Sequence, residues 1–178
     1  MVAGAGAVLD FWREAGPRKW FARDAAFDAR FRAGFLEAHF AASRRELEPW
    51  MDDADGALAL VLLLDQFPRN CFRDSAHAYA TDPLARHYAA RAVEAGFDAR
   101  VDPALRVFVY MPFEHSEDPA DQARCLELMR AVAPDYMRYA VAHRDVIARF
   151  GRFPHRNRAL GRVNTPEEQA WLDAGGGF

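Results

Sequence analysis

The sequence predicts an all-α fold, because helix start and stop signals recur along its 178 residues and strand signals do not. Four positions place a capping oxygen before a proline at the first helical position, namely Asp82-Pro83, Asp102-Pro103, Asp118-Pro119 and Thr165-Pro166. Gly96 and Gly151 follow apolar helical segments and are typical left-handed helix ends. No segment shows the sustained alternation of apolar and polar residues that predicts a half-buried strand. We therefore expect about eight helices in antiparallel α-hairpins, forming a single domain over residues 1–178.

The expected helices cover roughly residues 7–15, 24–47, 56–64, 74–80, 82–95, 119–132, 134–150 and 165–173, with another that starts at Asp102 and leads into Met111. Phe27, Phe31 and Phe35 recur every four residues, and this spacing predicts a stripe that faces the core. The helix from Gly56 to Leu64 is apolar on every side, which predicts a central, enclosed helix. The chain ends, residues 1–6 and 174–178, are expected to fray.

The composition is that of a globular protein and argues against a membrane-spanning or disulfide-rich one. Half of the residues are apolar and 28% are charged, the balance of an ordinary globular protein. The apolar run from Ala57 to Leu64 is far shorter than a membrane span, and the two cysteines are too few for a disulfide framework. We therefore expect a cytoplasmic protein with no membrane contact. The net charge of −3 also argues against nucleic acid as a partner.

A dense polar segment follows the apolar run that ends at Tyr110. In it, Glu114 and His115 come just after Pro112, where regular helical hydrogen bonding is interrupted. A carboxylate beside an imidazole can perform general acid–base chemistry, so these two residues are the catalytic candidates. The alternative is that they tie two helix ends together. Asp118 in the same segment is expected to cap the next helix.

Two further segments carry an arginine and an asparagine after Phe-Pro: Phe67-Pro68-Arg69-Asn70 and Phe153-Pro154-His155-Arg156-Asn157. Such groups can bind a carboxylate or a phosphate. With neighbouring residues they give the ligand-binding candidates Arg69, Asn70, His143, Arg152, His155, Arg156 and Asn157. The alternative is an internal salt-bridge network between these arginines and the acidic side chains near residue 115. Asp65, at the end of the buried helix, is expected to pair with an arginine.

No metal or cofactor is expected. The six histidines are scattered along the chain, and no pair has the i, i+4 spacing of a helical metal site.

Most of the chain resembles the bacterial family known as domain of unknown function 924. The matching segments are Leu62–Asn70, Ala80–Ala85, Pro112–Asp118 and His143–Asn157. The resemblance implies the tetratricopeptide-repeat-like helical fold in which that family is placed, although no repeat of fixed period is visible. It implies no activity.

The sequence thus favours a polar pocket where the three segments meet, binding a small anionic ligand. The alternative is a helical-hairpin module that binds a protein segment without catalysis. The residues leave open whether the protein is an enzyme, which ligand it binds and which oligomer it forms.

Overall fold

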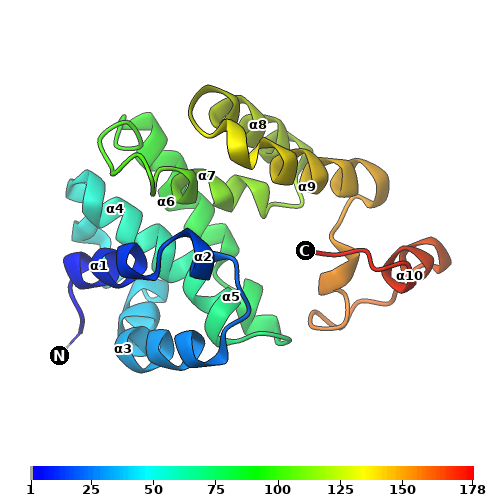
Figure 1. Cartoon of the computed structure of the whole chain (residues 1–178), viewed down its shortest axis with the longest axis horizontal. Helices are drawn as coiled ribbons and strands as arrows, with labels where there is room; N and C mark the ends of the chain where they lie inside the picture. Colours follow the sequence, from blue (N-terminus) through cyan, green and yellow to red (C-terminus); the bar gives the residue numbers. More distant parts are fainter. Residues whose placement is uncertain (1) are drawn as a thin grey trace.

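The computed structural model describes residues 2–178, and Met1 lies outside this range. Every regular element in it is helical, which confirms the all-α prediction. The helices of eight or more residues are α1 (Ala5–Ala15), α3 (Ala25–Ser43), α4 (Ala54–Val61), α6 (Asp82–Glu94), α7 (Val107–Glu114), α8 (Pro119–Val132), α9 (Met137–Phe150) and α10 (Pro166–Asp173). Figure 1 shows α1 to α6 gathered on one side, α8 and α9 side by side, and α10 at the far end.

Shorter helical turns connect these helices. They are α2 (Pro17–Trp20), η1 (Glu48–Asp52), η2 (Leu62–Gln66), α5 (Phe67–Cys71), η3 (Ala76–Tyr79), η4 (Pro134–Tyr136) and η5 (Pro154–Arg156). Neighbours in sequence pack together, as α7 does against α8 and α8 against α9. The tetratricopeptide-repeat-like arrangement stays a prediction.

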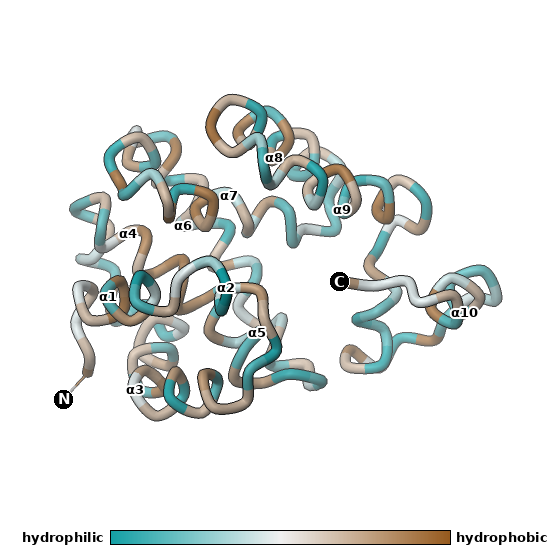
Figure 2. Tube along the Cα trace, in the orientation of Figure 1, coloured by the Kyte–Doolittle hydropathy of each residue, from teal (hydrophilic) through white to brown (hydrophobic). Residues whose placement is uncertain are grey.

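The core confirms two interpretations of the sequence. Phe27, Phe31 and Phe35 are all less than 7% exposed, and Phe11 stacks on the first two of them. All residues from Gly56 to Leu64 are buried, so α4 is the enclosed central helix. Figure 2 shows hydrophobic residues on the segments that face this interior. Each fully buried phenylalanine contributes about 2–3 kcal/mol of hydrophobic free energy.

The chain stays helical through Pro68, although the helix was expected to end at Leu64. Residues Leu62–Gln66 form a π turn, and α5 follows directly. Proline has no N–H to donate, so carbonyls one turn earlier need other donors. The Leu64 carbonyl accepts from Thr81 Oγ1 at 2.6 Å, and the Leu63 carbonyl lies 2.8 Å from His39 Nδ1. These side chains therefore stabilise a wide turn that orients Asp65.

Helix starts agree in part with the sequence. Asp118 caps α8, and Thr165 forms a capping box with Glu168. Asp82 is not a cap, because its carboxylate binds Arg69 instead. The helix expected from Asp102 begins only at Val107, after a turn.

Two chain-end observations bear on the expected fraying. Helix α1 already begins at Ala5, within the segment 1–6. At the other end, the Phe178 ring stacks on His143, with centroids 3.7 Å apart. The C-terminal segment thus returns to the middle of the molecule (Figure 1).

No helix among residues 2–178 combines the length and the apolar character needed to cross a membrane.

The role of Thr81 can be tested by a double-mutant cycle. Thr81→Val removes the donor to the Leu64 carbonyl, and we expect a loss of about 1–3 kcal/mol in the free energy of unfolding. In a Pro68→Ala background the restored backbone N–H can serve that carbonyl, so the same change should cost less. Urea unfolding of the four proteins measures both costs, and equal costs would contradict this account.

Candidate functional site

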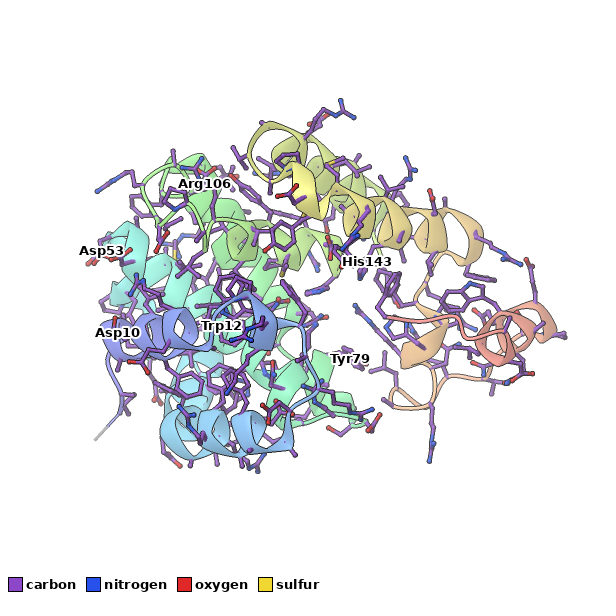
Figure 3. The ribbon with its side chains drawn as sticks, in the orientation of Figure 1. Asp10, Trp12, Asp53, Tyr79, Arg106 and His143 are labelled. Atoms are coloured by element: carbon purple, nitrogen blue, oxygen red, sulfur yellow. The ribbon has the colours of Figure 1, made fainter. Side chains whose placement is uncertain are left out.

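The three polar segments meet at a cavity between α5, the end of α7, α9 and the C-terminal segment. The cavity has two adjoining chambers. The aromatic chamber, of about 520 Å³, is lined among others by Trp20, Phe21, Met111, Glu114, Tyr136 and Tyr139. The arginine chamber, of about 540 Å³, is lined among others by Arg23, Tyr79, His155 and Arg156. Both chambers share Phe21, Arg69, Arg73, His115, His143 and Phe178. Figure 3 shows Tyr79 and His143 on facing sides of this region.

Asp65 and His115 form a carboxylate–imidazole pair at the junction of the chambers. Asp65 is fully buried, and its Oδ1 lies 2.8 Å from His115 Nδ1 and 3.0 Å from Arg69 Nη1. Burial raises the pKa of this carboxyl, but the charges of Arg69 and His115 outweigh that effect and lower it to about 2. Asp65 is therefore an anion at neutral pH. The expected arginine pairing is confirmed, and the histidine is an additional partner.

The protonation of His115 follows from this pair. Burial and the nearby Arg69 lower the pKa of His115, although Asp65 opposes them, so the ring is neutral at pH 7. A carboxylate can only accept, so Nδ1 carries the proton and donates it to Asp65. The lone pair is left on Nε2. His115 is thus a neutral base oriented by an anion.

Glu114 has the opposite character to Asp65. It is 4% exposed, and burial, followed by the charge of Asp65, raises its pKa to about 8. Its Oε2 atom is buried without a hydrogen-bond partner in the described chain. At neutral pH Glu114 is therefore mostly protonated and can donate a proton.

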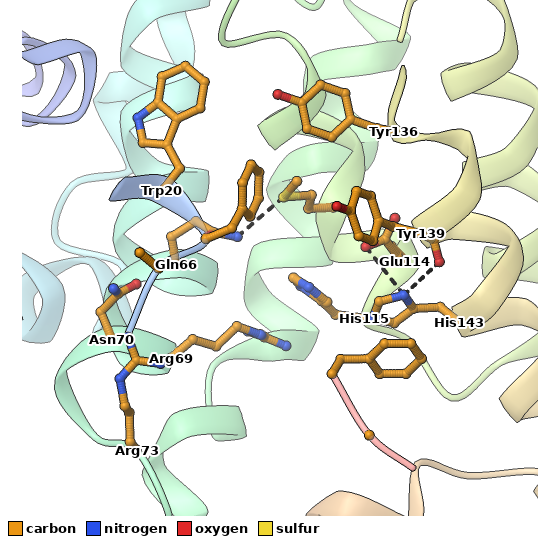
Figure 4. Close-up of a pocket in the computed structure, with 15 residues that line it drawn as sticks. Trp20, Gln66, Arg69, Asn70, Arg73, Glu114, His115, Tyr136, Tyr139 and His143 are labelled. Atoms are coloured by element: carbon orange, nitrogen blue, oxygen red, sulfur yellow. Dashed lines mark hydrogen bonds and ion pairs between the residues drawn. The ribbon is translucent and has the colours of Figure 1, made fainter. Parts of the chain in front are cut away.

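His143 from α9 completes this side of the cavity (Figure 4). Its Nδ1 lies 2.8 Å from the carbonyl of Tyr139 and 3.5 Å from Glu114 Oε1. Burial and His115 lower the pKa of His143 to about 3. The contact between Glu114 and His143 therefore joins two neutral groups and is not an ion pair.

Two arginines lie opposite, Arg156 buried and Arg69 partly buried. Arg69 makes a double hydrogen bond to Asp82, with both N···O distances 2.8 Å. Arg156 reaches the same carboxylate at only 3.3 Å, and its Nε atom is buried without a partner in the described chain. Its guanidinium lies over the rings of Phe153 and Tyr79. Burial and the charge of Arg69 lower the pKa of Arg156 to about 10.

Of the remaining ligand-binding candidates, two line the cavity and two do not. His155 lines the arginine chamber, where burial and Arg156 lower its pKa to about 4. Asn70 lines the aromatic chamber and donates to Asp28.

Arg152 and Asn157, by contrast, line neither chamber, and their role in ligand binding stays a prediction. Arg152 forms a double hydrogen bond with Glu168, and Asn157 donates to Asn164. Glu117 pairs with Arg162 in the same region. Of the salt bridges expected as an alternative, the pair of Glu117 with Arg162 is present, and together with the pair of Arg152 and Glu168 it fastens the C-terminal segment beside the cavity.

Sequence reasoning missed several residues of the cavity. Asp65 was expected only as a structural partner of an arginine, and Asp82 only as a helix cap. The aromatic residues Trp20, Tyr79, Tyr136, Tyr139 and Phe178 carried no signal, because aromatic side chains usually belong to a core. A charged residue followed by glutamine at the end of an apolar run was the available signal for Asp65.

Glu114, His115 and His143 also offer one metal-ligand atom each, all within 4.8 Å of one another. An oxygen and two imidazole nitrogens suit a zinc-like ion. However, Nδ1 of each histidine is already used toward an oxygen atom, so only Nε2 is available on either ring. The sequence missed this group because His143 comes from another helix.

The pKa of Glu114 can be tested through stability. The pKa is about 8 in the folded protein and near 4.5 when the side chain is solvated, so the folded state binds the extra proton between these values. The free energy of unfolding therefore falls as the pH rises through this window. The buried histidines act oppositely, but only below about pH 6.5.

We expect Glu114→Gln to become progressively more stable than the parent between about pH 4.5 and 8, by up to about 1.4 kcal/mol per pH unit. Urea unfolding at a series of pH values measures the difference. Glu127→Gln, on the exposed side of α8, is the matched control. A constant difference between Glu114→Gln and parent would show that the Glu114 pKa is ordinary.

Comparisons with known proteins agree with the all-α fold. A solved structure of a protein of unknown function from Agrobacterium tumefaciens is similar, with 55% sequence identity and a TM-score of 0.93. The match covers 96% of this chain and 97% of that one. Among curated proteins, none matches the chain. Residues 8–176 match the family described as bacterial protein of unknown function DUF924, and the chain therefore belongs to that family.

Proposed function

We propose that the cavity binds a small anionic ligand, held by arginines and placed next to the Asp65–His115 pair. The observation that carries this proposal is the incomplete hydrogen bonding of the buried Arg156. A guanidinium has five N–H donors, and Arg156 directs one of them at a side-chain acceptor, 3.3 Å away. Buried polar groups of native proteins are almost always satisfied, so a missing acceptor points to a ligand.

The electrostatics of the cavity support the same conclusion. Arg69 and Arg156 share the Asp82 carboxylate, and their mutual repulsion is one reason for the lowered pKa of Arg156. An anion between them and Arg73 would relieve this repulsion and supply oxygen acceptors. A carboxylate or a phosphate has the planar or tetrahedral oxygens that guanidinium groups bind in pairs.

Catalysis is a second step of the proposal. Asp65 holds His115 as a base with its lone pair on Nε2, while Glu114 is a protonated acid on the same wall. Two carboxyl groups whose surroundings push their pKa values apart are the arrangement expected for acid and base roles. A substrate between His115 and Glu114 could lose a proton to one and gain one from the other. His115 is the proposed catalytic base, and Asp65 is its positioning residue.

We place this activity in the cytoplasm, with a small molecule and neither nucleic acid nor membrane as the partner. The alternative, a module that binds a protein segment, needs an exposed apolar groove. Among the exposed large apolar residues, Phe21, Tyr139 and Phe178 belong to the cavity, whereas Val2, Val132, Leu160 and Val163 lie elsewhere. The small-ligand proposal therefore has the stronger support.

Anion binding can be tested by calorimetric titration with inorganic phosphate and with acetate. We expect saturable binding of at least one anion to the parent and a loss of about 10-fold or more in affinity for Arg156→Gln, because a charge-assisted hydrogen bond is removed. Arg152→Gln is the matched control, since it makes the same change outside the cavity.

Arg73→Gln provides a second variant, because Arg73 lies at the rim and is not packed between rings as Arg156 is. Melting temperatures of all variants identify any loss that comes from unfolding. The proposal would be abandoned if neither anion bound, or if Arg152→Gln lowered affinity as much as Arg156→Gln in folded proteins.

A further inference from the structure

The side chains that line the two chambers differ in chemistry. This difference defines the class of ligand more narrowly than the negative charge of the ligand does. The aromatic chamber brings together Trp20 at the end of α2, Phe21 in the α2–α3 connection and Tyr136 in η4. Trp20 and Phe21 meet edge to face at 6.5 Å, and Phe21 and Tyr136 are 5.8 Å apart. Phe21 is 55% exposed, so it forms part of the rim and not of the packed core. The side chains offer faces and edges to a flat apolar group.

The arginine chamber has the opposite character. Arg23 and Arg73 stand at its outer part, each with one acidic partner, Asp74 and Asp28 respectively. Arg156 lies deeper and is the least satisfied of the arginines that line it. No comparable gathering of cations lines the aromatic chamber beyond the shared Arg69 and Arg73.

His115, which is hydrogen-bonded to Asp65, lies at the junction between the two chambers. His115, His143 and Phe178 line both chambers, so the two volumes adjoin at these side chains. A ligand that fills both chambers would pass His115 at the point where its apolar part meets its charged part. Figure 4 shows His115 lying between the arginine side and the tyrosines of α9 and η4.

From this arrangement we infer that the ligand is a single amphipathic anion. Its carboxylate or phosphate lies against Arg73 and Arg156, and its flat apolar body lies among Trp20, Phe21 and Tyr136. The inference rests on the proposed function, because it names the substrate class of that site. Neither chamber alone would distinguish such a molecule from a simple anion or a neutral aromatic compound.

The affinity gained by placing a ring in the aromatic chamber is large enough to measure. Moving a phenyl ring from water into an apolar chamber removes roughly 100 Å² of apolar surface from water, which corresponds to an affinity gain of between about 10-fold and 100-fold. The gain should be seen only when the ring and the anion belong to one molecule, because two separate ligands each lose their own translational freedom.

The test compares three probes by calorimetry on the full chain: methyl phosphate, phenyl phosphate and phenol. We expect phenyl phosphate to bind at least 10-fold more tightly than methyl phosphate, and phenol to bind weakly and compete with phenyl phosphate. Tyr136→Ala should remove most of the advantage of phenyl phosphate while leaving methyl phosphate unaffected, since Tyr136 lines the aromatic chamber and not the arginine chamber.

Phe97→Ala, which removes a partly buried ring outside both chambers, is the matched control and should change neither affinity. Equal affinities of methyl and phenyl phosphate for the parent would overturn the inference and leave the proposed anion site intact. Failure of both phosphates to bind would remove the anion site and the inference together. An equal effect of Phe97→Ala and Tyr136→Ala would also overturn it.

Discussion

The cavity depends on one buried carboxylate. Asp65 is fully enclosed, and it is tolerated there because Arg69, His115 and Gln66 all lie within 3.0 Å of its oxygens. A buried charge without such partners would cost several kcal/mol. The same contacts that make Asp65 tolerable also fix Arg69 and His115 in place. The partners that a buried Asp65 requires therefore fix the position of both the proposed base, His115, and the cation Arg69.

The backbone explains why Asp65 points there. Pro68 cannot donate to the preceding turn, and the chain widens into a π turn whose released carbonyls are served by Thr81 and His39. π turns are often found at functional sites because they change the direction of a side chain without ending the helix. Facing this turn, α7 ends at Glu114, so His115 follows the last helical residue and can reach Asp65.

Much of the fold could be predicted from the sequence, because caps and helical periodicity are local signals. The caps at Asp118 and Thr165 and the enclosed helix near Leu60 depend on a few adjacent residues. The start of α7 was predicted wrongly, because a proline in a turn and a proline in a first helical turn look alike in sequence.

The site was predicted only in part for a different reason. The sequence indicated that three polar segments converge, but it could not separate Arg152, which fastens Glu168, from Arg156, which lines the cavity. Both follow the same glycine and both are arginines. Their roles depend on residues that are distant in sequence, Glu168 in one case and Asp82 in the other. Likewise, Phe178 reaches His143 only because the C-terminal segment turns back.

The central claim is that Asp65 holds neutral His115 with its proton on Nδ1 and its lone pair on Nε2. Nitrogen-15 NMR of the imidazole rings distinguishes this tautomer directly, with the His115 signals assigned from a His115→Gln variant. At pH 7 we predict a protonated, hydrogen-bonded Nδ1 and an unprotonated Nε2 for His115. A proton on Nε2 alone, or on both nitrogens, would contradict the account.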